Sequence, residues 1–203
     1  MIKIIDYGLG NILAFQNVYK RLNVDVAVAR NAGDLHGAAK LILPGVGAFD
    51  HAMELLEQSG MRQPLDDLVL DKRVPVLGIC VGMQVLARSS DEGQAPGLGW
   101  IDGHVKDFRS LRQKDLLIPH MGWNDVTPVS DTKLFDRLET GARFYFLHSY
   151  YFYCERRGDV AAVSTYGADF SSAVHCGNIY GVQFHPEKSH YFGTQLLRNF
   201  AEL

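Results

Sequence analysis

A cysteine between two glycines is the residue whose setting most clearly indicates chemistry. The segment Gly78-Ile79-Cys80-Val81-Gly82 ends an apolar run and is followed at once by helix-forming residues. Glycines around a nucleophile are typical of a sharp, strained turn between a buried strand and a helix, so we expect Cys80 to project from a sheet edge. A helix that begins there would favour the thiolate, and the Val81 amide could donate to an oxyanion.

The base that such a thiol requires occurs near the C-terminus. His185-Pro186-Glu187 follows the strand-like run 179–184. A cysteine nucleophile works with a group that takes and returns a proton, usually a histidine oriented by a carboxylate. If neighbouring strand ends bring the two segments together, Cys80, His185 and Glu187 form a catalytic triad.

Three further segments rich in glycine or proline indicate a function less specifically than the cysteine turn does. Pro44-Gly45-Val46-Gly47 follows a strand-like run; it could complete an oxyanion hole or be an ordinary turn, and both interpretations stay open. Gly8-Leu9-Gly10-Asn11 lacks the third glycine of the dinucleotide-binding fingerprint, which indicates a tight turn. Pro119-His120-Met121-Gly122-Trp123-Asn124 is predicted to be a loop.

The elements that must position these residues predict an α/β protein. Strand-like runs lie near residues 2–5, 24–28, 41–43 and 74–79. Helical stretches separate them, the first from about Asn11, which implies a parallel sheet with helices on both faces. After Ser89 a turn-rich loop leads to several strand-like runs, a short helix near 132–138 and a last helix near 191–201. We predict one domain, residues 1–203, with a flavodoxin-like three-layer α/β/α core, a mostly parallel sheet and an antiparallel strand extension.

Composition argues against several classes of function. The chain has 203 residues and a formal net charge of -3, and its 20 Lys and Arg residues are scattered, so we expect no nucleic-acid partner. No apolar run approaches the roughly 20 residues of a membrane helix, and Met1 leads directly into a strand, so we expect a cytoplasmic protein without membrane contact.

The remaining cysteines and histidines predict neither disulfides nor a metal site. Three cysteines far apart in the sequence fit a reducing compartment. Cys154 and Cys176 have no flanking glycines and are interpreted as packing residues. His185 and His190 lack a third ligand at a recognisable spacing, so no metal site is predicted.

Five segments, in order along the chain, resemble the class I (triad) glutamine amidotransferase family. They are the segments 6–11, 44–49, 78–84, 119–124 and 181–189. The cysteine turn and the His-Pro-Glu tripeptide resemble the class as a whole. The first and fourth segments resemble, within it, the glutaminase subunits of imidazole glycerol phosphate synthase. Val81 stands where the family more often has leucine, a change that keeps the backbone donor.

The resemblance implies a glutaminase with a thioester intermediate. Cys80 would attack the side-chain amide of glutamine, His185 would shuttle protons and Glu187 would orient His185. The amides of Val81 and Val46 would form the oxyanion hole, the latter after a peptide flip. The residues implied to hold glutamine are Gln84, Glu92, Gly47, Ser149 and Tyr150.

The resemblance also implies a partner that receives the ammonia. In this family it is a (β/α)₈ cyclase or synthase subunit, which forms a heterodimer with the glutaminase and makes imidazole glycerol phosphate and aminoimidazole carboxamide ribotide in histidine biosynthesis. Asn11, Met121, Trp123 and Lys188 match segments that face that partner, and no cofactor is implied. The alternatives that stay open are a paralogous glutaminase serving a sugar amidotransferase in surface polysaccharide biosynthesis, another cysteine hydrolase, and a non-catalytic flavodoxin-like binding module.

Overall fold

A parallel sheet forms the first part of the fold, as the alternating pattern predicts. The structure, a computed structural model, describes residues 1–113, 115–138 and 141–203. The parallel strands, in their order across the sheet, are β2 (Val26–Ala29), β1 (Ile2–Ile5), β3 (Lys40–Gly45), β4 (Val76–Cys80) and β13 (Ile179–Val182). β3 extends into the predicted turn, because Pro44 and Gly45 still pair with β4.

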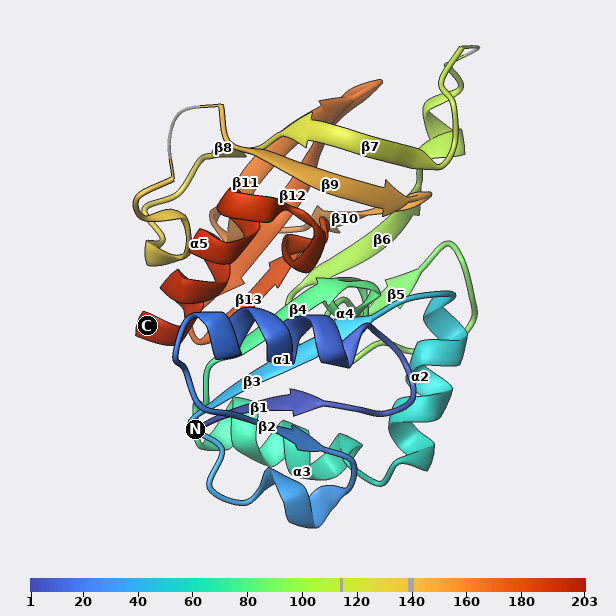
Figure 1. Ribbon diagram of the computed structural model, residues 1–203. Coiled ribbons are helices and arrows are strands. Elements are labelled where there is room, and N and C mark those ends of the chain that lie inside the picture. The colour runs from blue at the N-terminus through green and yellow to red at the C-terminus, as the bar shows by residue number, and fades with distance from the viewer. Residues whose placement is uncertain (114, 139–140) are drawn as a thin grey trace.

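Helices cover the parallel strands and make the three layers. α1 (Ile12–Arg21) connects β1 to β2, while α2 (Phe49–Gln58), α3 (Arg62–Asp66) and a helical turn (Asp67–Asp71) connect β3 to β4. The two connections run in opposite directions across the sheet, so right-handed crossovers bring them to opposite faces. Figure 1 shows α1 in front of the strands and α3 behind them. Within the described residues, no helix is both long and apolar enough to cross a bilayer.

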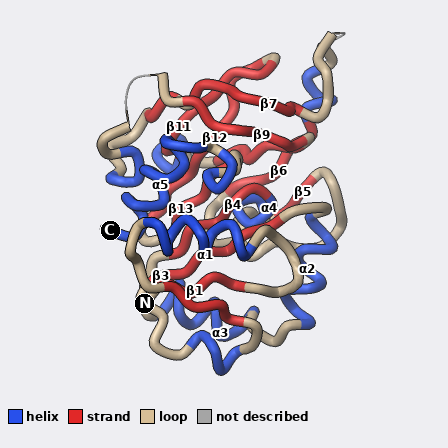
Figure 2. Tube along the Cα trace, in the orientation of Figure 1, coloured by secondary structure: helices blue, strands red, loops and turns tan. Residues whose placement is uncertain are grey.

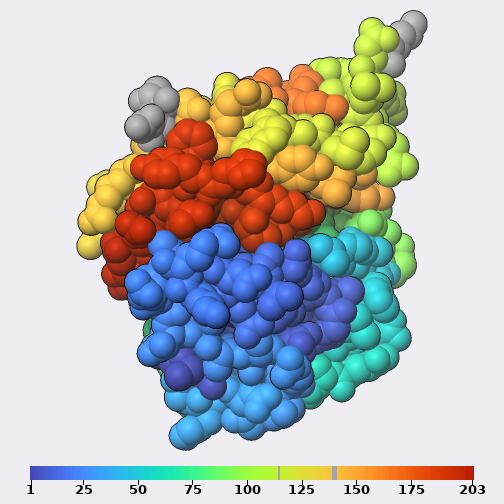
Figure 3. Space-filling model, viewed as in Figure 1, coloured from blue at the N-terminus to red at the C-terminus, as the bar shows by residue number. Residues whose placement is uncertain are grey.

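The last helix packs beside the first. α5 (His190–Glu202) buries Leu196, Leu197 and Phe200, as the sequence predicts, and the Tyr19 hydroxyl of α1 donates to the Leu197 carbonyl at 3.1 Å. The space-filling view shows the N-terminal and C-terminal segments in contact on this face (Figure 3). The two ends of the chain thus close one face of the sheet.

Beyond β13 the sheet continues mainly with antiparallel strands (Figure 2). These strands are β12 (Ala168–Cys176), β10 (Tyr150–Cys154), β6 (Gly103–Asp107), β11 (Val160–Tyr166) and β8 (Thr127–Pro128). The edge strand β5 (Ser89–Ser90) pairs in parallel with β6. β7 (His120–Asp125) and β9 (Arg143–His148) form a separate antiparallel pair. The predicted antiparallel extension is therefore present.

Two local predictions differ from the structure. The segment predicted as a loop is strand β7: Pro119 lies just before it, where no ladder N–H is needed, and Gly122 adopts the positive φ of 129° that the chain requires there. The predicted helix near 132–138 is a short 3₁₀ turn (Lys133–Phe135), capped by the Thr132 side chain.

Candidate active site

Three neighbouring strand ends bring the predicted triad to one edge of the sheet. β4 lies between β3 and β13, and the register pairs Gly45 with Cys80 and Val182 with Ile79. His185 lies three residues after the end of β13 and directly precedes the 3₁₀ turn Pro186–Lys188. Because the carboxyl ends of parallel strands meet at one edge, Cys80 lies between the glycine-rich turn after β3 and the histidine after β13.

Cys80 itself carries the backbone strain of the turn. Its φ is 56° and its ψ is -114°, whereas neither flanking glycine has a positive φ. A Cβ atom on Gly82 would overlap the Leu43 carbonyl oxygen, and one on Gly78 would come within 2.5 Å of the Gly82 oxygen. The glycines allow the turn to pack closely, and the positive φ of the turn is carried by the cysteine itself.

The helix predicted to begin after Cys80 is short. α4 (Val81–Gln84) is a single turn, after which the chain makes tighter i to i+3 hydrogen bonds, from Leu86 N to Met83 O and from Ala87 N to Gln84 O. So few aligned peptides produce only a weak dipole, although the N–H of Val81, the first helical residue, has no acceptor within the helix. Stabilisation of a thiolate must therefore come mainly from neighbouring groups.

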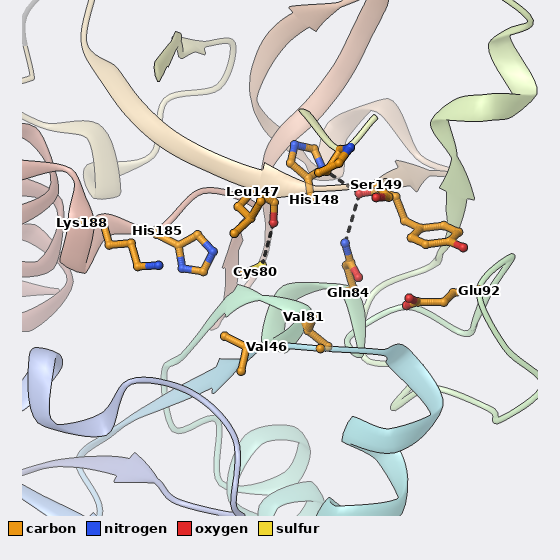
Figure 4. A pocket seen from close by; sticks show the side chains of 13 residues that line it. Val46, Cys80, Val81, Gln84, Glu92, Leu147, His148, Ser149, His185 and Lys188 are labelled. Atoms are coloured by element: carbon orange, nitrogen blue, oxygen red, sulfur yellow. Dashed lines mark hydrogen bonds between the residues drawn. The ribbon is translucent and has the colours of Figure 1, made fainter. Parts of the chain in front are cut away.

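The predicted catalytic and substrate residues surround one pocket of about 270 Å³. Those that line it are Val46, Gly47, Cys80, Val81, Gln84, Glu92, Ser149, Tyr150 and His185, together with Lys188. Figure 4 shows His185 and Lys188 at one end and Glu92 at the other. Cys80 and Gln84 lie between the two ends. A ligand that spans the pocket from Glu92 to His185 therefore passes the sulfur of Cys80.

His185 is buried and paired with Glu187. Its Nδ1 atom lies 2.9 Å from Glu187 Oε1, and the two side chains are only 5% and 3% exposed. Burial acts to lower the pKa of His185, but hydrogen bonding to Cys80 and Glu187, together with their charges, outweighs burial and raises the pKa to about 10. The imidazole is therefore a cation at neutral pH, which is the state that stabilises a neighbouring thiolate.

Two buried glutamines connect the pocket wall to the sulfur. Gln84 Nε2 donates to the Tyr150 carbonyl at 3.1 Å and to Gln183 Oε1 at 3.0 Å. Gln183 Nε2 in turn donates to Cys80 Sγ at 3.8 Å. Sequence reasoning missed Gln183, although strand alternation offered a signal, because residues 183 and 185 point to the same side of an extended chain.

Glu92 closes the far end of the pocket and also caps a helix. Its Oε2 atom accepts the Phe49 N–H at 2.9 Å, at the start of α2, where Ala48 provides no side-chain cap. Burial raises the pKa of Glu92, and the hydrogen bond from Phe49 opposes part of that rise. A carboxylate fixed in this way is suited to pair with an ammonium group of a ligand.

The turn after β3 is tied to the cysteine turn. The Tyr7 hydroxyl donates to the Pro44 carbonyl at 2.9 Å, and a Cβ atom on Gly45 would come within 2.5 Å of the Gly82 nitrogen. Val46 follows directly and lines the pocket. The two predicted oxyanion donors, Val46 and Val81, thus lie on turns that flank the sulfur.

The residues predicted to face a partner occupy different environments. Met121 and Trp123 are exposed on β7, and the Trp123 ring stacks on His190 with 5.4 Å between centroids. Lys188 lines the pocket. Asn11 is exposed, and its side chain accepts the Ala14 N–H at 3.2 Å, so it also caps α1, a structural role that the sequence interpretation did not assign.

Two buried histidines, one of them in the pocket wall, were also missed. His148 Nδ1 lies 2.7 Å from the Tyr150 carbonyl oxygen, and its Nε2 lies 2.9 Å from His120 Nδ1. Because a carbonyl oxygen only accepts, His148 carries its proton on Nδ1 and receives a hydrogen bond from His120. Burial lowers the pKa of His120 to about 4 and that of His148 to about 3. Both rings are therefore neutral near pH 7.

A second hydrogen-bonded Ser, His and Asp set lies outside this pocket. His104 Nδ1 is 2.7 Å from Ser89 Oγ, and its Nε2 is 2.7 Å from Asp91 Oδ1. Hydrogen bonding to His104 lowers the pKa of Asp91. The imidazole faces the serine with Nδ1 rather than with the Nε2 of a hydrolase triad. The set ties β5 and β6 to the loop that carries Glu92, which fits a structural role.

The other two cysteines lie in the sheet, away from the pocket. All three cysteines are free, and Cys154 and Cys176 lie on β10 and β12, as the packing interpretation predicts. Among the residues that the structure describes, no group of three or more His, Cys, Asp or Glu side chains is arranged to hold a metal ion.

Comparison with known proteins identifies the family. The model of the family described as glutamine amidotransferase class-I matches residues 3–203. The chain belongs to this family. The amidotransferase is 61% identical over 204 residues to the imidazole glycerol phosphate synthase subunit HisH of Bdellovibrio bacteriovorus, with all of both chains covered. It is 53% identical over 204 residues to the protein of the same name from Leptospira interrogans, again with all of both chains covered.

Solved structures share the fold of the amidotransferase. One, described as a glutamine amidotransferase, has a TM-score of 0.76 at 20% identity and covers 99% of this chain and 97% of its own. Another, a glutamine amidotransferase from Thermotoga maritima, has a TM-score of 0.64 at 22% identity and covers 92% of this chain and 75% of its own. At such low identities the likeness concerns the fold alone, and the predicted α/β class is confirmed.

Proposed function

We propose that this amidotransferase is the glutaminase subunit of an imidazole glycerol phosphate synthase. The observation that carries the proposal is the 61% identity, over the whole of both chains, to a protein of that name. The proposal treats residues 1–203 as one glutamine amidotransferase domain of a cytoplasmic protein, and the family match over residues 3–203 supports the single domain.

In the proposed reaction Cys80 is the nucleophile. Its thiolate attacks the γ-carboxamide carbon of glutamine, and the amides of Val81 and Val46 donate to the oxyanion that forms. His185, oriented by Glu187 at 2.9 Å, gives its proton to the leaving nitrogen. The C–N bond then breaks, ammonia departs and a γ-glutamyl thioester remains on Cys80.

Water completes the cycle. His185 is now neutral and takes a proton from the water molecule that attacks the thioester carbonyl carbon. The C–S bond breaks, glutamate leaves, and Cys80 returns to its thiolate beside a protonated His185. The proposed chemistry requires side chains, backbone amides and water, and no cofactor.

The pocket is proposed to hold glutamine by its two ends. Glu92, at the end remote from His185, pairs with the α-ammonium group, while Gln84 contacts the side-chain amide near Cys80. The other proposed substrate residues are Gly47, Ser149 and Tyr150. The proposal is supported by the position of all five residues in the lining of the pocket that contains Cys80.

The proposed partner is a cyclase subunit of (β/α)₈ type that receives ammonia directly. Ammonia released into water is protonated and loses its nucleophilic lone pair, so direct transfer keeps it reactive. In the partner it would react with a phosphoribulosyl formimino intermediate to give imidazole glycerol phosphate and aminoimidazole carboxamide ribotide. The exposed Met121 and Trp123, with Asn11 and Lys188, are proposed to form the contact surface.

The pathway is tested by co-purification with a cognate cyclase and an assay of imidazole glycerol phosphate formation. We expect activity with glutamine, and in Cys80→Ser we expect loss of the activity with glutamine but not of that with added ammonia. Failure with the cyclase, but ammonia transfer to a sugar amidotransferase, would assign the chain to the paralogous group.

The glutaminase step is tested by labelling Cys80 with an electrophilic glutamine analogue in the presence of the partner. We expect labelling that glutamine blocks. Labelling that glutamine leaves unchanged would favour another cysteine hydrolase, and no labelling would favour a non-catalytic binding module.

The contact surface is tested by Trp123→Ala. A buried tryptophan anchor contributes about 2 kcal/mol or more to an interface, so we expect the cyclase to bind about 30-fold more weakly. Tyr153→Ala is the matched control, because Tyr153 is 42% exposed and Trp123 is 41% exposed, and Tyr153 lies on β10. Equal cyclase affinity in both variants would contradict this surface.

A further inference from the structure

We infer that Gln183 is a further catalytic residue: its side-chain NH₂ group donates a hydrogen bond to Cys80 Sγ and stabilises the thiolate. The inference rests on the proposed role of Cys80 as the nucleophile. Gln183 is fully buried, and its Nε2 atom lies 3.8 Å from the sulfur. It therefore touches the reacting atom without contact with solvent.

The hydrogen-bond network fixes the orientation of the Gln183 amide. The Tyr150 carbonyl oxygen can only accept, so the Gln84 atom 3.1 Å from it is the NH₂ nitrogen. The second hydrogen of that NH₂ group points to Gln183 at 3.0 Å, so the Gln183 atom that it meets is the oxygen Oε1. The NH₂ group of Gln183 is therefore the end that faces Cys80.

The strand register explains why this amide reaches the sulfur. Val182, the last residue of β13, pairs with Ile79, the residue before Cys80. Gln183, the next residue, consequently lies level with Cys80, just beyond the end of β13. Its backbone N–H donates to the Ser172 carbonyl of β12 at 2.9 Å, which fixes the residue from the other side. The donor is thus held by the sheet on both sides.

A hydrogen-bond donor at this position stabilises the thiolate of Cys80 more than its thiol. The protonated Cys80 can donate its S–H to the Leu147 carbonyl oxygen, which lies 3.9 Å from the sulfur. The thiolate instead accepts from Gln183, and a hydrogen bond to an ionised acceptor is roughly twice as strong as one between neutral groups. The contact with Leu147 favours the thiol and the contact with Gln183 favours the thiolate, so the net effect of the stronger bond is to promote ionisation.

Titratable groups also face the sulfur and act in a different way. His185 contributes a positive charge, and Tyr7 is close enough that burial and the charge of Cys80 raise its pKa. The other titratable groups that line the pocket are His148, Glu92, Tyr150 and Lys188. Gln183 does not titrate, so its stabilisation of the thiolate is present at every pH at which the protein is folded.

The rate of Cys80 alkylation by iodoacetamide as a function of pH tests the inference, because the thiolate is the reactive form. Gln183→Met and Gln183→Leu remove the donor and keep an apolar side chain of similar volume. In each variant we expect the rise of the alkylation rate with pH to move to higher pH, so that alkylation on the acid side of that rise is about 10- to 100-fold slower, the range for one hydrogen bond to a charged group. Alkylation is followed on the Cys80 peptide by mass spectrometry, which separates it from Cys154 and Cys176.

Gln195→Met is the matched control. Gln195 is also buried, and its Nε2 atom bonds to Asn199 on α5 at 2.7 Å. We expect the wild-type alkylation profile in this variant. Wild-type profiles in both Gln183 variants, or an equal slowing in Gln195→Met, would overturn the inference. A wild-type Cys80 that reacts no faster at pH 7 than free cysteine would instead contradict its proposed role as the nucleophile.

Discussion

The neutral pair of His120 and His148 predicts that the protein loses stability in mild acid. In the unfolded chain each histidine titrates near its ordinary pKa of 6.5, whereas in the folded protein burial lowers the pKa to about 4 for His120 and about 3 for His148. Below pH 6.5 the unfolded chain therefore binds protons that the folded protein does not, so stability falls as the pH falls. The loss continues until the folded histidines are themselves protonated, near pH 3.

The magnitude follows from the two lowered pKa values. Between pH 7 and pH 5 each histidine lowers the free energy of unfolding by about 2 kcal/mol, and the pair lowers it by about 4 kcal/mol. His185 acts in the opposite direction, because its pKa is raised to about 10. Its contribution is fully present below pH 6.5 and is lost as the pH rises through about 10, so between pH 7 and pH 5 it adds about 1 kcal/mol.

Urea unfolding at pH 7 and pH 5 measures this difference. His120→Gln/His148→Gln replaces both rings by neutral amides that can still donate and accept, and the comparison with the wild type cancels the contribution of His185. We expect the wild type to lose about 4 kcal/mol more than the double variant between the two pH values. Equal losses in the two proteins would refute the reasoning that the folded structure keeps these histidines neutral.

Three further substitutions have expected outcomes. Gly82→Ala would press a methyl group against the Leu43 carbonyl oxygen, so we expect a loss of about 3 kcal/mol in urea unfolding, while Gly158→Ala, with open space around it, should change stability by less than about 0.5 kcal/mol. Phe200→Ala removes a fully buried ring from α5 and should lower the free energy of unfolding by about 3–5 kcal/mol. Glu187→Gln removes the carboxylate that orients the neighbouring histidine, so glutamine hydrolysis in steady-state assays should fall by about 100-fold or more at unchanged fold.

Strong local patterns made the parallel core predictable from the sequence. A parallel strand that is buried on both faces appears in a sequence as a short, continuous apolar run. Such runs, separated by helical stretches, indicate β1 to β4. The segment 119–124 was misassigned because proline and glycine usually mark turns. Its strand conformation depends on pairing with β9, from Met121 opposite Leu147 to Asn124 opposite Phe144. A single sequence does not reveal that pairing, since the two strands are separated along the chain.

The candidate site was predictable where a short motif encodes it. Cys80, His185 and Glu187 belong to two compact motifs whose residue types already indicate their chemistry. The buried His148 gave no comparable signal, because its tautomer and neutral charge depend on a carbonyl oxygen and on His120 from another strand. In an extended chain the side chains of residues 183 and 185 point the same way, which is a signal for Gln183. However, only the register of β13 against β4 brings the Gln183 side chain to the sulfur of Cys80.

The contacts around the Cys80 sulfur show why the ionisation of a catalytic thiol is harder to predict from a sequence than the identity of the catalytic residues. Besides His185, the Gln183 side chain and the backbone carbonyl of Leu147 contact the sulfur. Any residue at position 147 would provide that carbonyl, so no residue type in the sequence encodes the contact, which arises from the path of β9 across the end of β4. The two partners favour opposite protonation states of Cys80. Beyond the positive charge of His185, the ionisation of the thiol thus depends on one contact that is determined by residue type and one that is determined by the fold, and substitution at position 183 changes only the first.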